Sequence, residues 1–189
     1  MKAKIKRLIK ESNEVKATIL TEANLALIEE IASKIILALK NGGKVIIFGN
    51  GGSAADSQHM AAELVGRFKK ERKALGAIAL TTNTSTLTAL SNDYNYDVSF
   101  EKQVEALGKK GDVAIGISTS GAAKNVIRAL QAAKNAGCLT VALTGKGGGN
   151  IKEIADLSFI VRSDNTPRIQ EAHILIIHIL CELIEDEQV

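Results

Sequence analysis

The sequence predicts an α/β fold of three layers, in which a five-stranded parallel sheet lies between helices. The first observation behind this prediction is that short apolar segments recur along the chain after residue 43. The second is that segments with helical spacing separate them, an alternation typical of parallel sheets. The third is the unbroken apolar run Val45–Phe48, which indicates a strand buried on both faces.

The chain has the length and composition of one domain. Its 189 residues are 46% hydrophobic and 24% charged, as in ordinary globular proteins. We expect a single domain over residues 1–189, with a helical pair at 1–42, the candidate oligomer interface, and an α/β core at 43–189. The sequence shows no linker, repeat or low-complexity segment that would divide it.

Two helices are expected before the first strand. Their apolar residues recur at helical spacing: Ile5, Leu8, Ile9, Val15 and Ile19, then Leu27, Ile28, Ile31, Ile35, Ile36 and Leu39. Asn41-Gly42-Gly43 ends the second helix. Stripes this broad pack either against another subunit or on the chain's own sheet, and the periodicity leaves both open.

The rest of the chain alternates between strands and helices. The expected strands are Lys44–Phe48, Gly76–Thr81, Asp112–Ile117, Leu139–Thr144 and Leu157–Val161. The helices between and after them include Ala122–Ala136 and about Pro167–Glu187. In such folds the ligand binds at the carboxyl ends of the strands, where most of the polar loops of this sequence fall.

The charge pattern and the cysteines narrow the possible partners. A net charge of +3, without a basic block interleaved with aromatic residues, disfavours nucleic-acid binding. The densest basic cluster, Lys69 to Lys73, is expected at a solvated helix end. Cys138 and Cys181 have apolar neighbours and no metal-type spacing, which favours buried thiols in a reducing compartment. Without a secretory signal or a bilayer-length apolar run, the protein is expected in the cytoplasm, away from membranes.

The most informative segment follows the first strand. Gly49, Gly51 and Gly52 allow a sharp turn and a close approach of the backbone to a ligand. Ser53 is expected to be the N-cap of the next helix, whose N–H groups and positive dipole end would then face an oxyanion. A turn that merely requires glycine is the alternative, but it explains neither Asn50 nor Ser53.

The helix after this turn carries two groups suited to proton transfer. His59 and Glu63 are four residues apart and therefore lie on one helix face. Their position below an anion site fits a small phosphorylated molecule whose other end undergoes proton transfer.

A second candidate oxyanion loop, Ser118-Thr119-Ser120-Gly121, follows the third strand. Three hydroxyls and a glycine before a helix can surround a phosphate. An ordinary serine-rich turn would look similar, but the glycine turn in the same sheet strengthens the prediction. Neither loop has the Walker or dinucleotide-binding pattern, which disfavours a nucleotide.

The final helix carries further polar groups among apolar residues. Gln170 and His178 are eight residues apart and lie on roughly the same face. His178 stands among isoleucines and leucine, so its imidazole either has a buried partner or faces a ligand. Taken alone, each histidine of this helix is more often a core residue with a satisfied partner, and for His173 we keep that interpretation.

Four segments together resemble a known family. GNGGSAADSQHMAAEL, NDY, GISTSG and RIQEAHILIIH are similar to segments of the phosphoheptose isomerases, members of the sugar-isomerase (SIS) domain group. The likeness runs over essentially the whole chain. It implies interconversion of sedoheptulose 7-phosphate and D-glycero-D-manno-heptose 7-phosphate through an enediol. The pathway implied is synthesis of ADP- or GDP-heptose for a bacterial surface polysaccharide, such as lipopolysaccharide. The expected assembly is a homotetramer.

The same resemblance assigns roles to residues. The positions matching His59, Glu63, Gln170 and His178 bind one zinc ion per subunit or act on the substrate. Glu63 would be the base that takes the carbon-bound proton, and His178 its partner acid or base. Zinc would polarise the carbonyl. The sugar phosphate would be held by a further set of residues: Asn50, Gly51, Gly52, Ser53, Asn92, Asp93, Ser118, Thr119 and Ser120.

Two departures from the family pattern and two rival functions remain. Ala122 and Ala123 stand where members often carry a serine, and Pro167 stands where some carry an acid. Both departures concern details of the site.

One rival function is that of a non-catalytic SIS protein that binds a partner protein. Such regulators replace the counterparts of Glu63 and His178, which this chain retains. The other is a sugar-phosphate sensor, which needs the phosphate loops but no acid–base pair.

Overall fold

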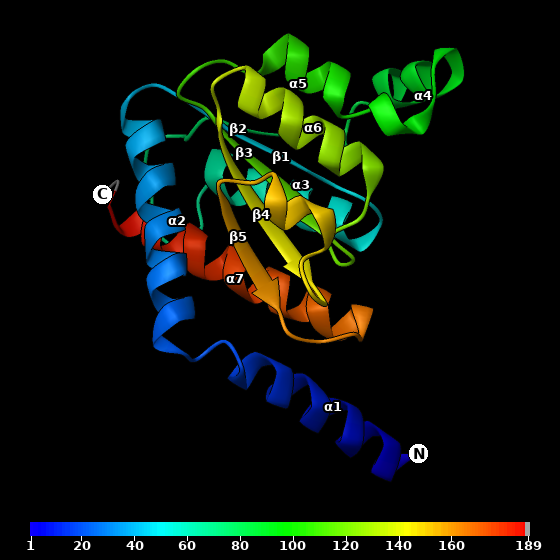
Figure 1. Cartoon of the computed structure of the whole chain (residues 1–189). Helices are drawn as coiled ribbons and strands as arrows, with labels where there is room; N and C mark the ends of the chain where they lie inside the picture. Colours follow the sequence, from blue (N-terminus) through cyan, green and yellow to red (C-terminus); the bar gives the residue numbers. More distant parts are fainter. Residues whose placement is uncertain (188–189) are drawn as a thin grey trace.

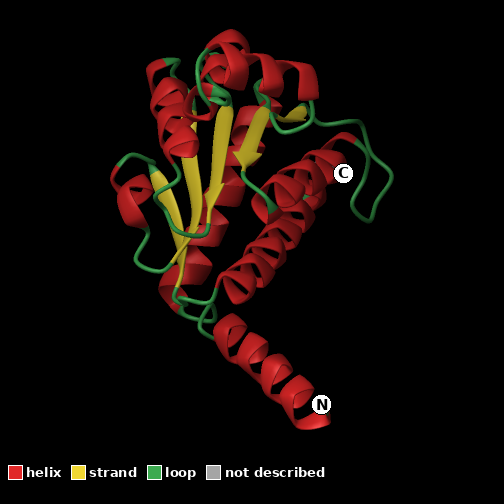
Figure 2. Ribbon diagram, turned by 90° about the vertical axis from the view of Figure 1, so that its right-hand side faces the viewer, coloured by secondary structure: helices red, strands yellow, loops and turns green. Residues whose placement is uncertain are grey.

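Helices cover both faces of a five-stranded parallel sheet in the computed structural model, which describes residues 1–187 (Figure 1, Figure 2). The predicted fold class is therefore confirmed. In chain order the elements are α1 (Lys2–Ala17), α2 (Glu22–Lys40), β1 (Val45–Gly49), α3 (Gly52–Val65), β2 (Ala77–Ala79), α4 (Thr84–Asp93), the 3₁₀ turn η1 (Tyr96–Val98), α5 (Glu101–Leu107), β3 (Val113–Ser118), α6 (Lys124–Asn135), β4 (Leu139–Gly145), η2 (Gly149–Glu153), β5 (Leu157–Val161) and α7 (Thr166–Asp186).

The strand order is β2-β1-β3-β4-β5, and every neighbouring pair is parallel. The chain first adds β2 on one side of β1 and then crosses to add β3 on the other. The loops after β1 and β3 consequently leave the sheet in opposite directions, which opens a crevice between them. Gly49 is paired with Ile117, so the residues that follow both strands emerge side by side at this crevice.

The alternating side chains of the buried strands build two apolar layers. Val45 and Ile47 of β1 join the layer formed with α2, α3 and α7, whereas Ile46 and Phe48 join the layer formed with α5 and α6. All four side chains are fully buried. The unbroken apolar run in the sequence thus reflects burial on both faces of the sheet.

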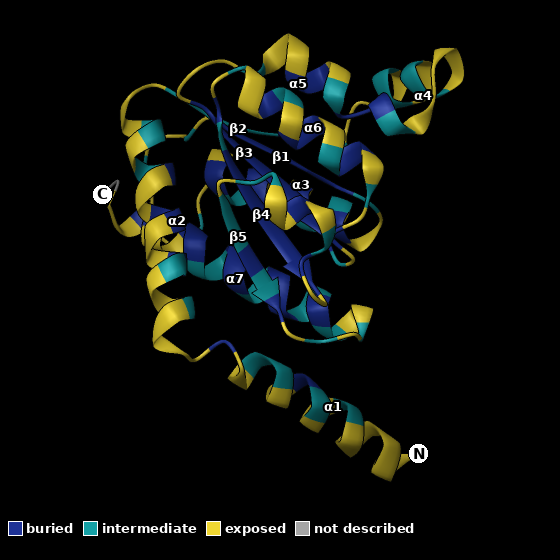
Figure 3. Cartoon of the chain, viewed as in Figure 1, coloured by how far each residue is buried: buried dark blue, intermediate teal, exposed yellow. Residues whose placement is uncertain are grey.

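The two N-terminal helices differ in how they pack. α2 places Ile28, Ile31 and Ile35 in the layer shared with α3 and α7, so this stripe serves the chain's own core. α1 lies against the N-terminal end of α7 through polar contacts, including Arg168 Nη1 to Leu8 O at 2.9 Å and Ser12 Oγ to a Glu171 carboxylate oxygen at 2.6 Å. Figure 3 shows α1 as mainly exposed or half-buried.

Two expectations for the segment after α3 need correction. The basic cluster at Lys69 to Lys73 is not a solvated helix end, because α3 ends at Val65 and the side chain of Arg72 is only 2% exposed. The second strand is shorter than expected, with three residues at the sheet edge, where it pairs only with β1.

Within residues 1–187, no helix combines the length and apolar character that a membrane crossing requires.

Candidate active site

The glycine turn connects β1 to α3 and has the conformation that only glycine adopts readily. Gly51 has φ +58° and occupies the N-cap position, and α3 begins at Gly52. The prediction that Ser53 is the N-cap is therefore wrong. Ser53 is the second helical residue; its N–H donates to Asn50 O at 3.0 Å and its side chain is buried. With Gly51 as its N-cap, α3 starts two residues earlier than a Ser53 N-cap would place it.

Gly52 lies directly against the side chain of Gln170 on α7. A Cβ at Gly52 would collide with the Gln170 amide, whose Cδ would be 2.8 Å away. The glycine at this position therefore admits the glutamine side chain, and the turn and the final helix meet at one point. This contact brings together two residues predicted to share a site, although 118 positions separate them.

Asn50 is held by two residues that the sequence did not single out. Its amide forms a reciprocal pair with the Asn125 amide, with both N–O distances 2.9 Å, and Tyr96 Oη donates to Asn50 Oδ1 at 3.0 Å. Asn125 stands at the start of α6, just after the hydroxyl loop, and this place in the sequence could have identified it as a site residue. Nothing local marks Tyr96. Because Asn50 Oδ1 already accepts twice, its remaining capacity is one N–H donor, which suits an anionic or hydroxyl ligand.

The hydroxyl loop lies next to the glycine turn, as predicted. Ser118 ends β3 and is buried, whereas Ser120 is exposed and its Oγ accepts the Ala122 N–H at 3.2 Å. Gly121 has φ +65° and packs against the backbone of Gly148 and Gly149. The hydroxyl loop therefore packs against the loop that follows β4. Phosphate binding by these hydroxyls stays a prediction.

The predicted acid–base residues meet where α3 and α7 run side by side. His59 Nε2 lies 2.9 Å from His178 Nε2 and 3.2 Å from Glu63 Oε1. Two N–H groups cannot face each other, so one imidazole nitrogen of the pair offers its lone pair. The Glu63 side chain is 23% exposed and that of His59 43% exposed, so the group is open to a small ligand. Phe68, which the sequence did not indicate, places its ring 5.7 Å from the His178 ring.

Asp56 adds a titratable group one turn before His59. One of its carboxylate oxygens is buried without a hydrogen-bond partner. Burial raises the pKa of Asp56 to about 6, and the nearby His59 opposes part of that rise. Its spacing on the helix, three residues before His59, is the signal that could have found it.

Two of the predicted residues lie apart from these contacts. Asn92 and Asp93 end α4, and the Asn92 amide donates to its neighbour Asp93 at 2.9 Å. Figure 1 shows α4 at the periphery of the molecule.

His173 is fully buried in α7, with Nε2 2.9 Å from Thr144 O. The interpretation of His173 as a core residue is confirmed.

The donor chemistry of the predicted metal ligands suits zinc, because two imidazoles, a carboxylate and an amide oxygen are nitrogen and oxygen ligands that zinc accepts. Within the described part of the chain, however, no three His, Cys, Asp or Glu side chains are arranged so that they could hold a metal ion. His59 contacts both His178 and Glu63, while Gln170 lies at Gly52. Zinc binding stays a prediction.

The chain is similar to several known proteins. A model of the SIS domain matches residues 9–145. The chain is 57% identical over 186 residues to the phosphoheptose isomerase of Aquifex aeolicus, which covers 98% of this chain and 97% of that protein. A phosphoheptose isomerase structure from Neisseria gonorrhoeae is similar with a TM-score of 0.90 and 43% identity over 98% of each chain. One from Francisella tularensis is similar with a TM-score of 0.93 and 37% identity over 97% of each chain.

Proposed function

The chain belongs to the phosphoheptose isomerases of the SIS domain family, and from this membership we propose that it interconverts sedoheptulose 7-phosphate and D-glycero-D-manno-heptose 7-phosphate. The observation that carries the proposal is the contact of His59 with both Glu63 and His178 beside two candidate oxyanion loops. Aldose–ketose isomerisation of a sugar phosphate needs an acid–base group and an anion site, and these residues and loops would supply both.

The length of α3 separates the two ends of such a substrate. Seven residues from Gly52 to His59 correspond to roughly 10 Å along the helix axis. A phosphorylated sugar carries its phosphate and its carbonyl at opposite ends. The phosphate would lie between the glycine turn and Ser118-Thr119-Ser120, where Asn50 offers an N–H donor. The carbonyl end would then lie at His59, Glu63 and His178.

Isomerisation moves a proton between two adjacent carbons through an enediol. Glu63 would remove the proton from the carbon, because its carboxylate is held at 3.2 Å from His59 and is three-quarters buried. His178 would give and take the proton on the oxygen, because its Nε2 faces the same point from α7.

We extend the proposal to one zinc ion per subunit, for which His59, Glu63, Gln170 and His178 are the candidate ligands. Glu63 and His178 cannot coordinate the ion and act as free proton-transfer groups at the same instant. When bound, such an ion supplies a Lewis acid that polarises the substrate carbonyl. The glutamine in this ligand set predicts modest affinity and loss of the metal on purification. Binding would require Gln170 to turn from Gly52 toward the histidine pair.

The assembly we propose is a homotetramer. An apolar groove of about 600 Å³ lies between α1, α2 and α7. Its lining includes Leu20 and Leu25, which are 75% and 44% exposed, and Ile5 and Ile9 of α1 are also exposed. Apolar side chains gathered in this way favour contact with a second copy of the chain.

We place the enzyme in the cytoplasm, which the unpaired buried thiols of Cys138 and Cys181 support.

The alternative is a non-catalytic SIS protein that binds a partner. The retained Glu63 and His178 favour the enzyme, because a purely binding role does not need an acid–base pair. The discriminating experiment is an assay of the purified protein with sedoheptulose 7-phosphate, before and after chelation and with zinc restored. Turnover supports the enzyme. Binding of the sugar phosphate without turnover, with zinc present, would favour the non-catalytic alternative.

A further inference from the structure

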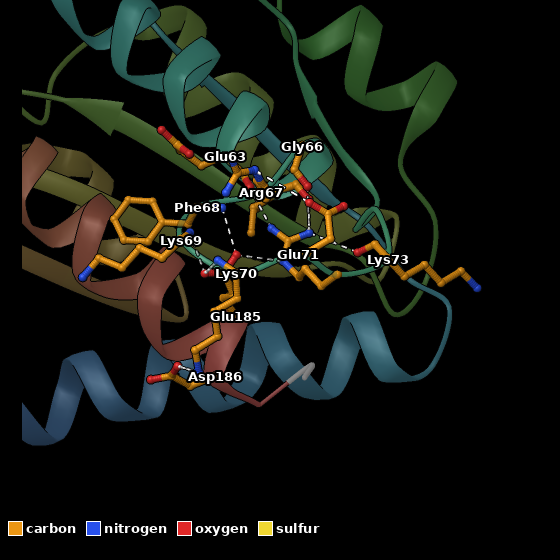
Figure 4. A network of polar contacts seen from close by, with 12 residues as sticks. Glu63, Gly66, Arg67, Phe68, Lys69, Lys70, Glu71, Lys73, Glu185 and Asp186 are labelled. Carbon is orange, nitrogen blue, oxygen red and sulfur yellow. Dashed lines mark hydrogen bonds and ion pairs between the residues drawn. The ribbon is translucent and has the colours of Figure 1, made fainter.

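The segment from 66 to 76, between α3 and β2, contains neither helix nor strand. A network of hydrogen bonds and a buried ion pair nevertheless holds it in place (Figure 4). It leaves α3 directly after the turn that carries Glu63. Its first residues run beside the C-terminal part of α7, the helix that carries His178. The network therefore touches both helices of the candidate active site.

Glu185 of α7 is the acceptor of the network. Its carboxylate accepts the backbone N–H groups of Phe68 at 2.8 Å, Lys69 at 2.7 Å and Lys70 at 2.9 Å. Burial raises the pKa of Glu185, but these three donors and the Arg72 guanidinium lower it more, so the pKa lies below its ordinary value. A charged carboxylate with three backbone donors holds this short stretch in one conformation.

Arg72 is the donor of the network. Its guanidinium donates to the carbonyl oxygens of Glu63 at 2.7 Å and Leu64 at 2.9 Å, and its Nε lies 3.3 Å from Glu185 Oε1. The last carbonyls of a helix have no partner within the helix, so Arg72 caps the end of α3. Both side chains of the pair are only 2% exposed. Since desolvation offsets much of the attraction in a buried pair, the position of the pair is more informative than its contribution to stability.

The consequence of this network is the placement of Phe68. The centroid of its ring lies 5.7 Å from the centroid of the His178 ring. The His178 centroid lies 5.1 Å from that of His59. Figure 4 shows the Phe68 ring and the Glu63 side chain extending to the same side of the network. The ring torsion of a histidine is intrinsically broad, so two aromatic neighbours restrict the orientation of this imidazole.

We propose that Phe68 is a positioning residue of the isomerase, which orients the His178 imidazole, and that the Arg72–Glu185 pair holds Phe68 in place. The inference rests on the proposed function for its kinetic consequences. A misoriented proton-transfer group slows the chemical step, whereas the predicted phosphate contacts lie in the glycine turn and the hydroxyl loop, away from Phe68.

The test compares Phe68→Leu, which removes the ring, with Phe68→Tyr, which keeps it. We expect Phe68→Leu to lower kcat roughly tenfold with little change in KM, and Phe68→Tyr to retain most of kcat. The matched control is Glu182→Gln. It removes an exposed α7 carboxylate that pairs with Lys69 of the same segment, and it should leave both constants unchanged. Unchanged kcat in Phe68→Leu, or an equal loss in Phe68→Tyr, would overturn the proposal.

A second readout needs no turnover. The chain has three histidines, so their ring signals in an NMR spectrum are few enough to assign. Phe68→Leu should shift the His178 signals and leave those of buried His173 in place. His178 signals at their wild-type positions would contradict the positioning role. A wild-type protein without turnover, whose His178 signals still respond to Phe68→Leu, would overturn the proposed function but not the positioning.

Glu185→Gln tests the second half of the proposal. Its kcat should fall with KM retained, and the double variant with Phe68→Leu should lose less than the product of the two single losses, because both act on the same ring. Independent, multiplicative losses would remove the Arg72–Glu185 pair from the mechanism. If Glu185→Gln does not fold, the Phe68 variants still decide the role of the ring, because they leave the buried pair intact.

Discussion

The Nε2 atoms of His59 and His178 lie 2.9 Å apart, although 119 residues separate them in the sequence. Each histidine stands on a different helix of the same sheet face, and Glu63 contacts the first of them at 3.2 Å. Two imidazoles and a carboxylate thus meet at a single point on the surface.

Glu63→Gln should abolish turnover. The substitution keeps the size of the side chain and much of its hydrogen bonding but removes the base, so kcat should fall roughly 10²-fold or more while the protein stays folded. His178→Gln should behave alike, and a His59 substitution should chiefly weaken metal retention. Glu71→Gln, at a side chain that is 90% exposed, is the control. An active Glu63→Gln protein, measured with sedoheptulose 7-phosphate, would contradict the mechanism.

Ser120→Ala should separate binding from chemistry. A hydroxyl that holds phosphate in both the ground state and the transition state contributes to affinity, so KM should rise roughly tenfold and more than kcat falls. Ser85→Ala, at an exposed position of α4, serves as the control. A loss confined to kcat would place Ser120 outside the phosphate site.

Gly52→Ala should disturb the site through Gln170. The new Cβ would displace the Gln170 amide, so kcat/KM should fall roughly 10- to 100-fold without loss of folding. Gly147→Ala is a matched control, because a Cβ there has nothing within 4 Å. Equal activity of both variants would show that the position of Gln170 does not matter to the reaction.

His173 should make stability depend on pH. Burial lowers its pKa to about 4, against a smaller opposing effect of its hydrogen bond to Thr144 O. Its stabilising contribution is complete above about pH 6.5. Between that pH and about 4 the unfolded chain binds a proton that the folded chain does not, and the free energy of unfolding should fall by about 3 kcal/mol in total. Urea unfolding of the wild type and of His173→Gln measures this loss, and identical pH dependence of the two would contradict it.

The wild-type protein should sediment as a tetramer at micromolar concentration. Leu20→Lys places a charge in the apolar groove, so it should shift the protein toward smaller species. Leu107→Lys, on the exposed part of α5, tests whether any new surface lysine has this effect. A stable wild-type monomer would argue directly against the proposed assembly.

Much of this molecule follows from its sequence alone. The apolar run at β1 and the alternation after residue 43 predicted the parallel sheet, since burial on both faces leaves a direct mark on composition. The resemblance carried by the histidine, glutamate and glutamine segments indicated the family. The burial of His173 was also predicted, because a lone histidine on such a helix is more often a core residue with a satisfied partner.

Only the tertiary structure decided how distant residues meet. The strand order placed the loops after β1 and β3 side by side, and the packing of α3 on α7 joined His59 to His178 and Gly52 to Gln170. The hydrogen bond from Tyr96 to Asn50, and the pairing of Arg72 with Glu185, join separate elements without any local signal. Sequence periodicity reports which face of an element is buried, whereas a contact between elements depends on where the chain crosses the sheet and how its helices then pack.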